Sequence, residues 1–462
     1  MKMDEERLNS GMSLALVDYF RCPKGCAEVG LEGELGAEAR VFRLGPDLTC
    51  YGRTTRGVSQ TVINGDAPDL AGFVRTENSC CALPFDPNEV ATNLRRERYV
   101  TAGPGNGGKS ALAKLKRNAY YAVRPLLGVS IRKHLQRASL KGWEKKPFPR
   151  WPVDRSVDQM FEQLLAWQLE ARGGGRTPFV WFWPEGMKSC VIMTHDVEEK
   201  TGLDFCPALM ELDASFGIKS SFQFIPEGRY PTPRKLLNAI RANGFEVNVH
   251  DFNHDGHLYD SREVFRHRAA KINEYVKKFA CLGFRAGVLY RNLEWYDAFE
   301  FSYDMSVPNV GHLDPQPGGC CTVMPYYVGK ILELPLTTTQ DYSLFNVIGD
   351  YSIDLWKNQM ALIAKGHGLI SFNVHPDYVI ESRAFDVYKK LLAYLSEFCS
   401  ENHAWFALPG EVDQWWRERS QMSIVTAADG KLRIEGPGKE RARIAWARLE
   451  DGGLSFSVEG GR

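Results

Sequence analysis

The sequence lacks a net charge, a long apolar segment and a regular cysteine pattern. Its 462 residues contain 57 basic and 57 acidic side chains, which excludes a disordered polyelectrolyte and a histone-like DNA packer. No window of 18 consecutive apolar residues is present, so no transmembrane helix is predicted. The first twenty residues lack the features of a signal peptide, and the eleven cysteines are scattered. We therefore expect a cytoplasmic protein with reduced thiols.

Changes in composition divide the chain into four predicted regions. Residues 1–100 mix short alternating stretches with Gly, Pro and Asp turns, which predicts a small α+β or β-rich region. Residues 101–180 form a basic helical region that ends in a glycine-rich linker at 171–178. Residues 181–420 follow as the main domain, and Asp-Gly turns at 429 and 451 predict a β-rich C-terminal extension over 421–462.

Between residues 181 and 420, short β-rich runs alternate with amphipathic helical patterns. The runs include SCVIMTHD (189–196), SSFQFIP (220–226), FEVNVH (245–250) and LISFNVHP (369–376). One helical pattern places on a single face Phe265, Ala269, Ile272, Val276 and Phe279. This alternation is typical of βα units, and about seven units in this length predict an α/β fold with a (β/α) barrel.

Polar side chains are concentrated at the ends of the predicted strands, where parallel barrels carry their active sites. They are Thr194, His195, Asp196 and Glu198 after the first run, His250, His254 and His257 after the third, Arg285, and His375 near the end.

Two of these residues, His250 and His254, are four apart, and a turn at Asp255-Gly256 would bring both imidazoles onto one ion. Two histidines and one carboxylate are a metal-binding set that leaves a coordination position open for water. The alternative is a pair of loop histidines that only form hydrogen bonds. Asp196 is the candidate base, and His375 is either the complementary acid or part of a structural His-Pro turn.

Four motifs in this order resemble those of the polysaccharide deacetylase family, the metal-dependent carbohydrate esterases with a NodB-type domain. The similar residues are Thr194-His195-Asp196 for the first motif, His250 with His254 for the metal motif, Arg285 in GFRAGVLY, and His375 in NVHP. The similarity covers about residues 188–416, half of the chain. It implies a distorted (β/α) barrel that binds zinc or a similar divalent ion.

The resemblance also implies an activity, the hydrolysis of the N-acetyl group of an aminosugar in a glycan or glycan precursor. The implied roles are metal binding by His250, His254 and a carboxylate, proton abstraction by Asp196, orientation of Asp196 by Arg285, and protonation of the departing amine by His375. Asp304 is loosely similar to the acid of the family's fourth motif, which supports this cluster.

The sequence departs from the family pattern at the third metal ligand. The family commonly has two adjacent aspartates, whereas Val197 follows Asp196 here and the next acid is Glu198. Since residues i and i+2 of a strand share a side, either Glu198 or Asp196 fits, and we predict Glu198 as the ligand. Three more departures are Asp251, Gly287 and Asn373, which indicate a divergent member with an altered substrate or lost activity.

Several alternatives remain open at the level of sequence. GPGNGGKS (103–110) fits the letters of a P-loop, although the charged stretch before it is a poor buried strand for a nucleotide-binding domain. The basic, partly apolar segment 109–140 would suit peripheral contact with an anionic membrane or a lipid-linked sugar. A non-catalytic glycan-binding barrel is a further alternative, and no nucleic-acid recognition module is apparent.

Overall fold

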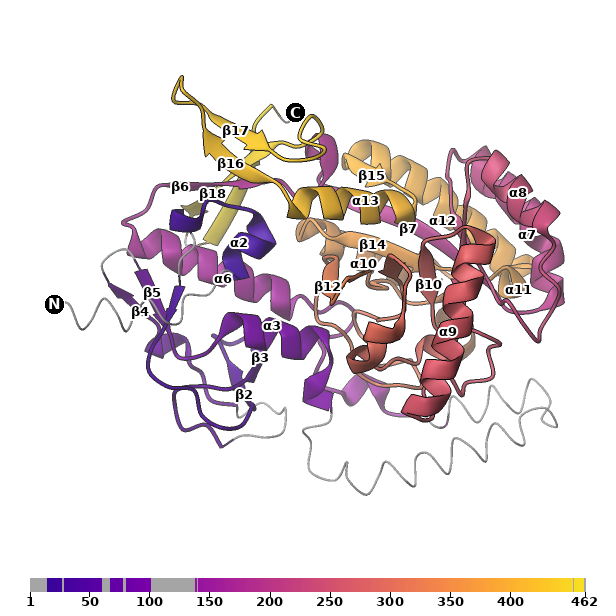
Figure 1. Ribbon diagram of the computed structural model, residues 1–462, viewed down its shortest axis with the longest axis horizontal. Coiled ribbons are helices and arrows are strands. Elements are labelled where there is room, and N and C mark those ends of the chain that lie inside the picture. Colours follow the sequence, from indigo (N-terminus) through magenta and orange to yellow (C-terminus); the bar gives the residue numbers. More distant parts are fainter. Residues whose placement is uncertain are drawn as a thin grey trace. The chain divides into compact units, whose positions relative to one another are not determined.

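The computed structural model describes residues 15–26, 29–59, 67–77, 80–100, 138, 140–451 and 453–460. The chain forms two compact units, whose elements are labelled in Figure 1. Unit 1 combines Met1–Pro104, Arg155–Met187 and Gln414–Arg462, and unit 2 combines Gly105–Asp154 with Lys188–Asp413. These units cut across the four regions predicted from composition, because strand pairing joins segments that are distant in the sequence.

Unit 1 is built from short helices and small sheets. Its elements are α2 (Ala15–Phe20), η1 (Lys24–Cys26), β1 (Val29–Leu31), β2 (Arg40–Arg43), β3 (Thr49–Gly52), η2 (Ala71–Phe73), β4 (Arg75–Glu77), β5 (Cys80–Leu83), α3 (Pro87–Arg95), η3 (Arg98–Val100), α6 (Ser156–Ala171), β6 (Arg176–Val180), η6 (Pro184–Gly186), β16 (Ser423–Thr426), β17 (Leu432–Glu435), β18 (Ile444–Glu450) and β19 (Gly453–Val458). The sheets have the strand orders β1-β5-β4, β2-β3, β19-β18-β6 and β16-β17.

Strand β6 corrects one expectation from the sequence. The predicted linker 171–178 contains the glycine turn after α6, but residues from Arg176 onward pair antiparallel with β18. Pairing with a strand more than 260 residues away satisfies the backbone groups of this segment, and local composition does not reveal it.

The buried side chain of Arg419 joins the three segments of unit 1. Its guanidinium donates to the carbonyl oxygens of Tyr19, Phe20, Val180 and Trp181 at 2.8 to 3.2 Å. Since each buried carbonyl needs a donor, one side chain satisfies groups from the N-terminal helix and from the chain around β6.

Unit 2 contains the large sheet and the helices that cover it. Its elements are η5 (Trp143–Lys145), β7 (Ser189–Val197), α7 (Lys200–Ser215), β8 (Ser221–Phe224), α8 (Arg234–Ala242), β9 (Glu246–His250), α9 (Arg262–Phe279), β10 (Gly283–Arg285), η7 (Gly287–Leu289), η8 (Leu293–Ala298), β11 (Tyr303–Asp304), β12 (Tyr326–Val328), β13 (Ile331–Glu333), η9 (Ser343–Ile348), α10 (Asp354–Lys365), β14 (Leu369–Asn373), α11 (Pro376–Val379), α12 (Ser382–Glu401) and β15 (Ala404–Phe406). The chain passes into unit 1 within α13 (Pro409–Ser420).

The nine strands of this sheet have the order β12-β13-β11-β10-β9-β8-β7-β14, and β15 also pairs with β7. All pairs are parallel except β12 with β13. The segment after β13 reaches β14 through the amide of Thr338, which donates to the Ser371 carbonyl at 3.2 Å. The sheet is therefore curled into a half-barrel, which is consistent in outline with the predicted (β/α) barrel.

The predicted βα alternation is regular only in part of the sheet. Helices α7, α8 and α9 follow β7, β8 and β9, and the face of α9 predicted as apolar is buried. The connection from β10 to β11 contains only the 3-10 turns η7 and η8, and β12 rather than a helix precedes β13. The parallel strands still end at one edge, which brings their terminal side chains together.

Candidate active site

Strand β7 presents alternate residues to opposite sides. Thr194 and Asp196 lie on the face of the sheet that carries Arg285. Val197 lies on the opposite face, in the apolar core between the sheet and the helices. His195 also points to the helices, where its Nε2 lies 3.0 Å from Asp213 on α7. Glu198 follows the strand directly and is the first residue of the loop to α7.

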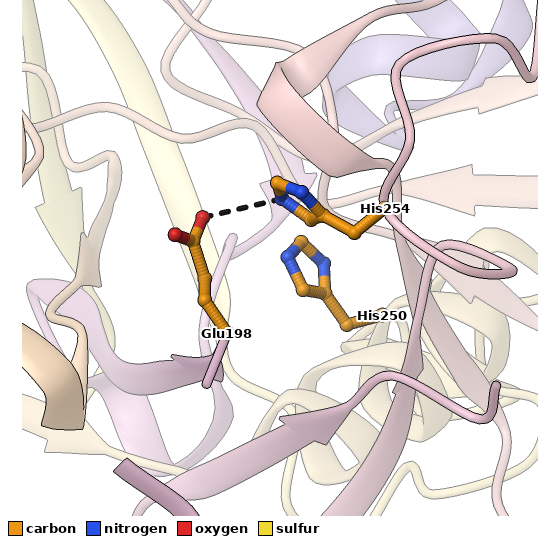
Figure 2. A group of neighbouring side chains, drawn as sticks. All are labelled: Glu198, His250 and His254. Atoms are coloured by element: carbon orange, nitrogen blue, oxygen red, sulfur yellow. Dashed lines mark ion pairs between the residues drawn. The ribbon is translucent and has the colours of Figure 1, made fainter. Parts of the chain in front are cut away.

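Glu198, His250 and His254 form a cluster of candidate metal ligands (Figure 2). One ligand atom from each lies within 4.8 Å of the others. Glu198 Oε1 is 3.2 Å from His254 Nε2, and the rings of the two histidines have centroids 4.9 Å apart. The three side chains are largely buried, and Glu198 is the most exposed at 18%.

The loop after β9 bends sharply to bring His254 back beside His250. Asp251 and His254 both have positive φ angles of 54°, a conformation that is uncommon for residues with a side chain. Gly287 makes room for this bend, because a Cβ there would overlap Asp251 Oδ2 and lie 3.0 Å from His254 Cδ2. Gly287 differs from the residue that is common in the family motif, and the space needed by the loop that carries His254 explains this difference.

The donor atoms of the cluster fit a divalent metal ion. His250 Nδ1 donates to the Arg285 carbonyl at 3.1 Å, which leaves Nε2 as the free lone pair. That Nε2 is buried and has no hydrogen-bond partner among the described residues. Two ligands bound to a tetrahedral zinc at about 2.0–2.1 Å lie roughly 3.3 Å apart, close to the separation of Glu198 Oε1 and His254 Nε2. The set of two imidazoles and one carboxylate is typical of catalytic zinc.

The electrostatics of these three groups also favour a bound cation. Burial alone would raise the pKa of Glu198, but His254 and His375 outweigh it and hold that pKa well below its usual range. Burial lowers the pKa of His250 and keeps its imidazole neutral, the form that binds metal. Burial opposes the imidazolium of His254, but Glu198 outweighs this effect and raises the pKa of His254. The carboxylate and the two imidazoles therefore lie together in a largely buried position.

Asp196 lies beside this cluster and is held by two donors. Arg285 Nη1 donates to its Oδ1 at 3.1 Å, and Asn373 Nδ2 donates to its Oδ2 at 2.9 Å. Burial would raise the pKa of Asp196, but Arg285, His250 and His375 together lower it below its usual value. The carboxylate is therefore ionised and fixed in orientation, with its Oδ2 toward His375.

His375 stands at the end of β14 and is oriented by Asp341. Its Nδ1 lies 2.6 Å from Asp341 Oδ1, and its backbone amide donates to Asp341 Oδ2 at 2.8 Å. The free Nε2 is 4.0 Å from Asp196 Oδ2 and 3.9 Å from Glu198 Oε1. Burial opposes the imidazolium, but Asp341 and the neighbouring carboxylates raise the pKa of His375 to about 10.

The structure separates the predicted site residues into two groups. It brings together six of the predicted residues, which are Asp196, Glu198, His250, His254, Arg285 and His375. His257 lies apart and pairs with Asp260, and His195 faces the helices. Asp304, loosely matched to the fourth motif, contacts Tyr296 and Ser306, and Asp341 takes the position beside His375.

Sequence reasoning missed two residues that hold the proposed base and acid, one in a loop and one at the end of β14. Asp341 lies in TTTQDYS after β13, and Asn373 was noticed only as a departure from the family pattern. Alternation along LISFNVHP places Asn373 and His375 on the same side, which is the signal that would have predicted Asn373. No periodic pattern marks Asp341.

Two other predictions fall outside the structural description. The glycine-rich stretch 103–110 and nearly all of the basic segment 109–140 lie outside the described residues. Among the described helices, none combines the length and apolar character needed to cross a bilayer.

Comparison with known proteins gave structural matches only. No protein-family model matches the sequence, and the comparison with curated proteins found no match. A protein from Mycobacterium smegmatis assigned as a polysaccharide deacetylase is similar with a TM-score of 0.42 and 18% identity, over 52% of this chain and 93% of that chain. PuuE allantoinase is similar with a TM-score of 0.42 and 13% identity, over 51% of this chain and 92% of that chain.

A family 4 acetyl xylan esterase from Clostridium thermocellum, solved with a cobalt ion, is a third similar structure. It has a TM-score of 0.30 and 12% identity, over 49% of this chain and 91% of that chain. Polysaccharide deacetylases are thus among the solved structures that about half of this chain resembles.

Proposed function

We propose that the chain is a metal-dependent hydrolase that removes an N-acetyl group from an aminosugar of a glycan or glycan precursor. One observation carries the proposal. The three candidate metal ligands, an ionised carboxylate held by an arginine, and a histidine held by a carboxylate meet at one end of the sheet. The His375 Nε2 atom lies 4.0 Å from Asp196 Oδ2 and 3.9 Å from Glu198 Oε1. A metal site, a base and an acid are the groups that amide hydrolysis requires.

His250, His254 and Glu198 are the proposed ligands of a divalent ion, with zinc as the expected metal. When bound, such an ion polarises the acyl carbonyl and lowers the pKa of water. The chain's own contribution is to fix the ligand atoms, with the Arg285 carbonyl holding His250 in the tautomer whose Nε2 is free.

Asp196 is the proposed general base. It takes a proton from the attacking water, whose oxygen forms the new bond to the acyl carbon. Arg285 and Asn373 keep its carboxylate ionised and oriented, so that Oδ2 stays on the side of His375. Because the same donors stabilise the neutral acid only weakly, Asp196 then releases this proton, which balances the proton that His375 delivers to the amine.

His375 is the proposed general acid. Asp341 holds Nδ1 and stabilises the imidazolium, so Nε2 carries a proton toward the reacting groups. That proton passes to the nitrogen as the carbon–nitrogen bond breaks, and the products are a carboxylic acid and a free amine. Because an amine is a poor leaving group until it is protonated, a general acid at this position suits an amide substrate.

Metal content and acetate release test the proposal together. Purified wild-type protein is expected to contain about one divalent ion per chain and to release acetate from N-acetylated sugars. His250→Ala is expected to lose both properties, because Nε2 is a ligand atom. His257→Ala is the matched control, since this histidine lies in the same loop region and pairs with Asp260 outside the cluster. A metal-free wild type that releases no acetate would overturn the proposal.

A further inference from the structure

Glu198 lies outside the hydrogen-bonded part of the sheet, because β7 ends at Val197. Its side chain also leaves the strand one residue beyond the segment that pairs with β8. A ligand in this position needs support from elsewhere, since a free glutamate side chain has three rotatable bonds to order on binding. The structure provides this support from α11, which lies beside α7 (Figure 1).

The first support is Asp377, which binds the backbone around Glu198. Its Oδ2 accepts from the Glu198 amide at 2.9 Å, and its Oδ1 accepts from the amides of Glu199 and Gly202 at 3.2 and 2.9 Å. Asp377 thus satisfies amides at the start of α7 from another helix. Gly202 gives it room, because a Cβ there would overlap the carboxylate.

The second support is Tyr378, which binds the side chain of Glu198. Its hydroxyl donates to Glu198 Oε2 at 2.9 Å. The other oxygen, Oε1, remains directed at His254 Nε2 and faces His375 Nε2 at 3.9 Å. One carboxylate oxygen is therefore occupied by the tyrosine and the other is left for the ligand cluster.

We propose that Asp377 and Tyr378 are positioning residues that make Glu198 a metal ligand through Oε1 alone. This inference rests on the proposed metal site and extends it to a function for the whole segment 375–378. His375 supplies the acid, Asp377 fixes the backbone at Glu198, and Tyr378 fixes the carboxylate. One short stretch of chain therefore carries the proposed acid, His375, and also positions the proposed third ligand, Glu198.

The expected effect is on metal affinity, because partners of this kind orient the ligand rather than touch the metal. Loss of such a hydrogen bond typically weakens metal binding about 10- to 100-fold. Tyr378→Phe removes only the hydroxyl and keeps the ring beside His375 and Tyr342. The variant is therefore expected to fold and to bind the ion more weakly.

The test measures binding of Zn²⁺ by competition with a chromophoric chelator, together with the visible spectrum of the Co²⁺-loaded protein. Tyr378→Phe is expected to raise the dissociation constant for Zn²⁺ about 10-fold or more and to change the Co²⁺ spectrum. Tyr296→Phe is the matched control, since this buried tyrosine also donates to a carboxylate, Asp304 Oδ2 at 2.7 Å, outside the ligand cluster. The control is expected to keep wild-type Zn²⁺ affinity.

A double-mutant comparison shows whether Tyr378 acts through Glu198. In a Glu198→Ala background, Tyr378→Phe is expected to change Zn²⁺ affinity by less than about 2-fold, because the ligand it positions is already lost. Asp377→Asn provides a second variant and is expected to weaken Zn²⁺ binding as well. Equal effects of Tyr378→Phe in both backgrounds, or wild-type affinity in the single variant, would overturn this proposal alone. A wild type that binds no divalent ion would overturn the proposed function with it.

Discussion

The backbone carbonyl of Arg285 accepts from His250 Nδ1 at 3.1 Å, while the guanidinium of the same residue donates to Asp196 at 3.1 Å. One residue at the end of β10 therefore holds both a candidate metal ligand and the candidate base. The two contacts use different parts of the residue, so substitution of the side chain separates them.

Arg285→Lys is expected to impair catalysis and to leave metal binding intact. The ammonium cannot replace the guanidinium contacts to Asp196, Thr194 and the Met305 carbonyl, so the base loses its orientation. The backbone carbonyl that orients His250 remains. With an N-acetylated sugar that the wild type deacetylates, the kcat of the variant should fall about 10²-fold or more. Its dissociation constant for Zn²⁺ should stay within about 3-fold of the wild-type value. Arg262→Lys, at an exposed ion pair with Asp297, is the control that should match wild type. Parallel loss of metal and activity would contradict this separation.

Gly287→Ala is expected to disturb the histidine loop. The added Cβ would overlap Asp251 and press on His254, so the loop must shift. Overpacking of this kind costs about 1–3 kcal/mol, and displacement of His254 should weaken Zn²⁺ binding about 10-fold or more. Thermal unfolding and chelator competition measure the two effects. Gly72→Ala, where a Cβ meets nothing within 4 Å, serves as the comparison and should change neither. An unaltered affinity in Gly287→Ala would show that the loop accommodates the methyl group.

Asp341→Asn is expected to slow the step that needs the acid. The amide still accepts a hydrogen bond but no longer stabilises the His375 imidazolium by charge, and the contact at Nδ1 weakens. We expect kcat to fall about 10²-fold with KM and Zn²⁺ content nearly unchanged. Steady-state kinetics and metal analysis check this split. Asp350→Asn, which removes a carboxylate bound to Ser352 in the next loop, should retain the wild-type rate. A fall in metal content instead would place Asp341 in metal binding.

Glu333→Gln is expected to remove part of the pH dependence of stability. Burial, followed by the charge of Asp304, raises the pKa of Glu333 well above its usual value. The folded protein therefore keeps a proton that the unfolded chain releases above its ordinary glutamate pKa, so stability falls as the pH rises toward the raised pKa. For one proton the slope is about 1.4 kcal/mol per pH unit.

Glutamine keeps the protonated shape without titrating, so the variant should lack this slope. Its advantage in the free energy of unfolding over wild type should grow as the pH rises above the ordinary glutamate pKa toward the raised one, as measured by urea denaturation at each pH. Glu227→Gln, at a tyrosine contact outside the barrel interior, is the reference substitution. Equal slopes for Glu333→Gln and wild type would show that the buried acid is ionised in the folded protein.

The sequence by itself determined the repeating elements and the identity of the chemical groups. Period-two runs and apolar helix faces predicted β7, β8, β9 and β14 and the buried face of α9, because burial of one side forces these spacings. Polar residues at the strand ends predicted the cluster of His250, His254 and His375, since parallel strands end at one edge.

Only the tertiary structure decided which loop groups complete the site. Asp341, Asp377 and Tyr378 reach their partners from loops and a short helix, where no periodic pattern fixes the direction of a side chain. Alternation also leaves the choice between Asp196 and Glu198 open, because residues two apart in a predicted strand share one side. The contacts of the two carboxylates differ. Arg285 and Asn373 donate hydrogen bonds to the two oxygens of Asp196, whereas Glu198 Oε1 faces His254. Which oxygen is free depends on donors that lie more than 80 residues away in the sequence, and local pattern carries no information about them.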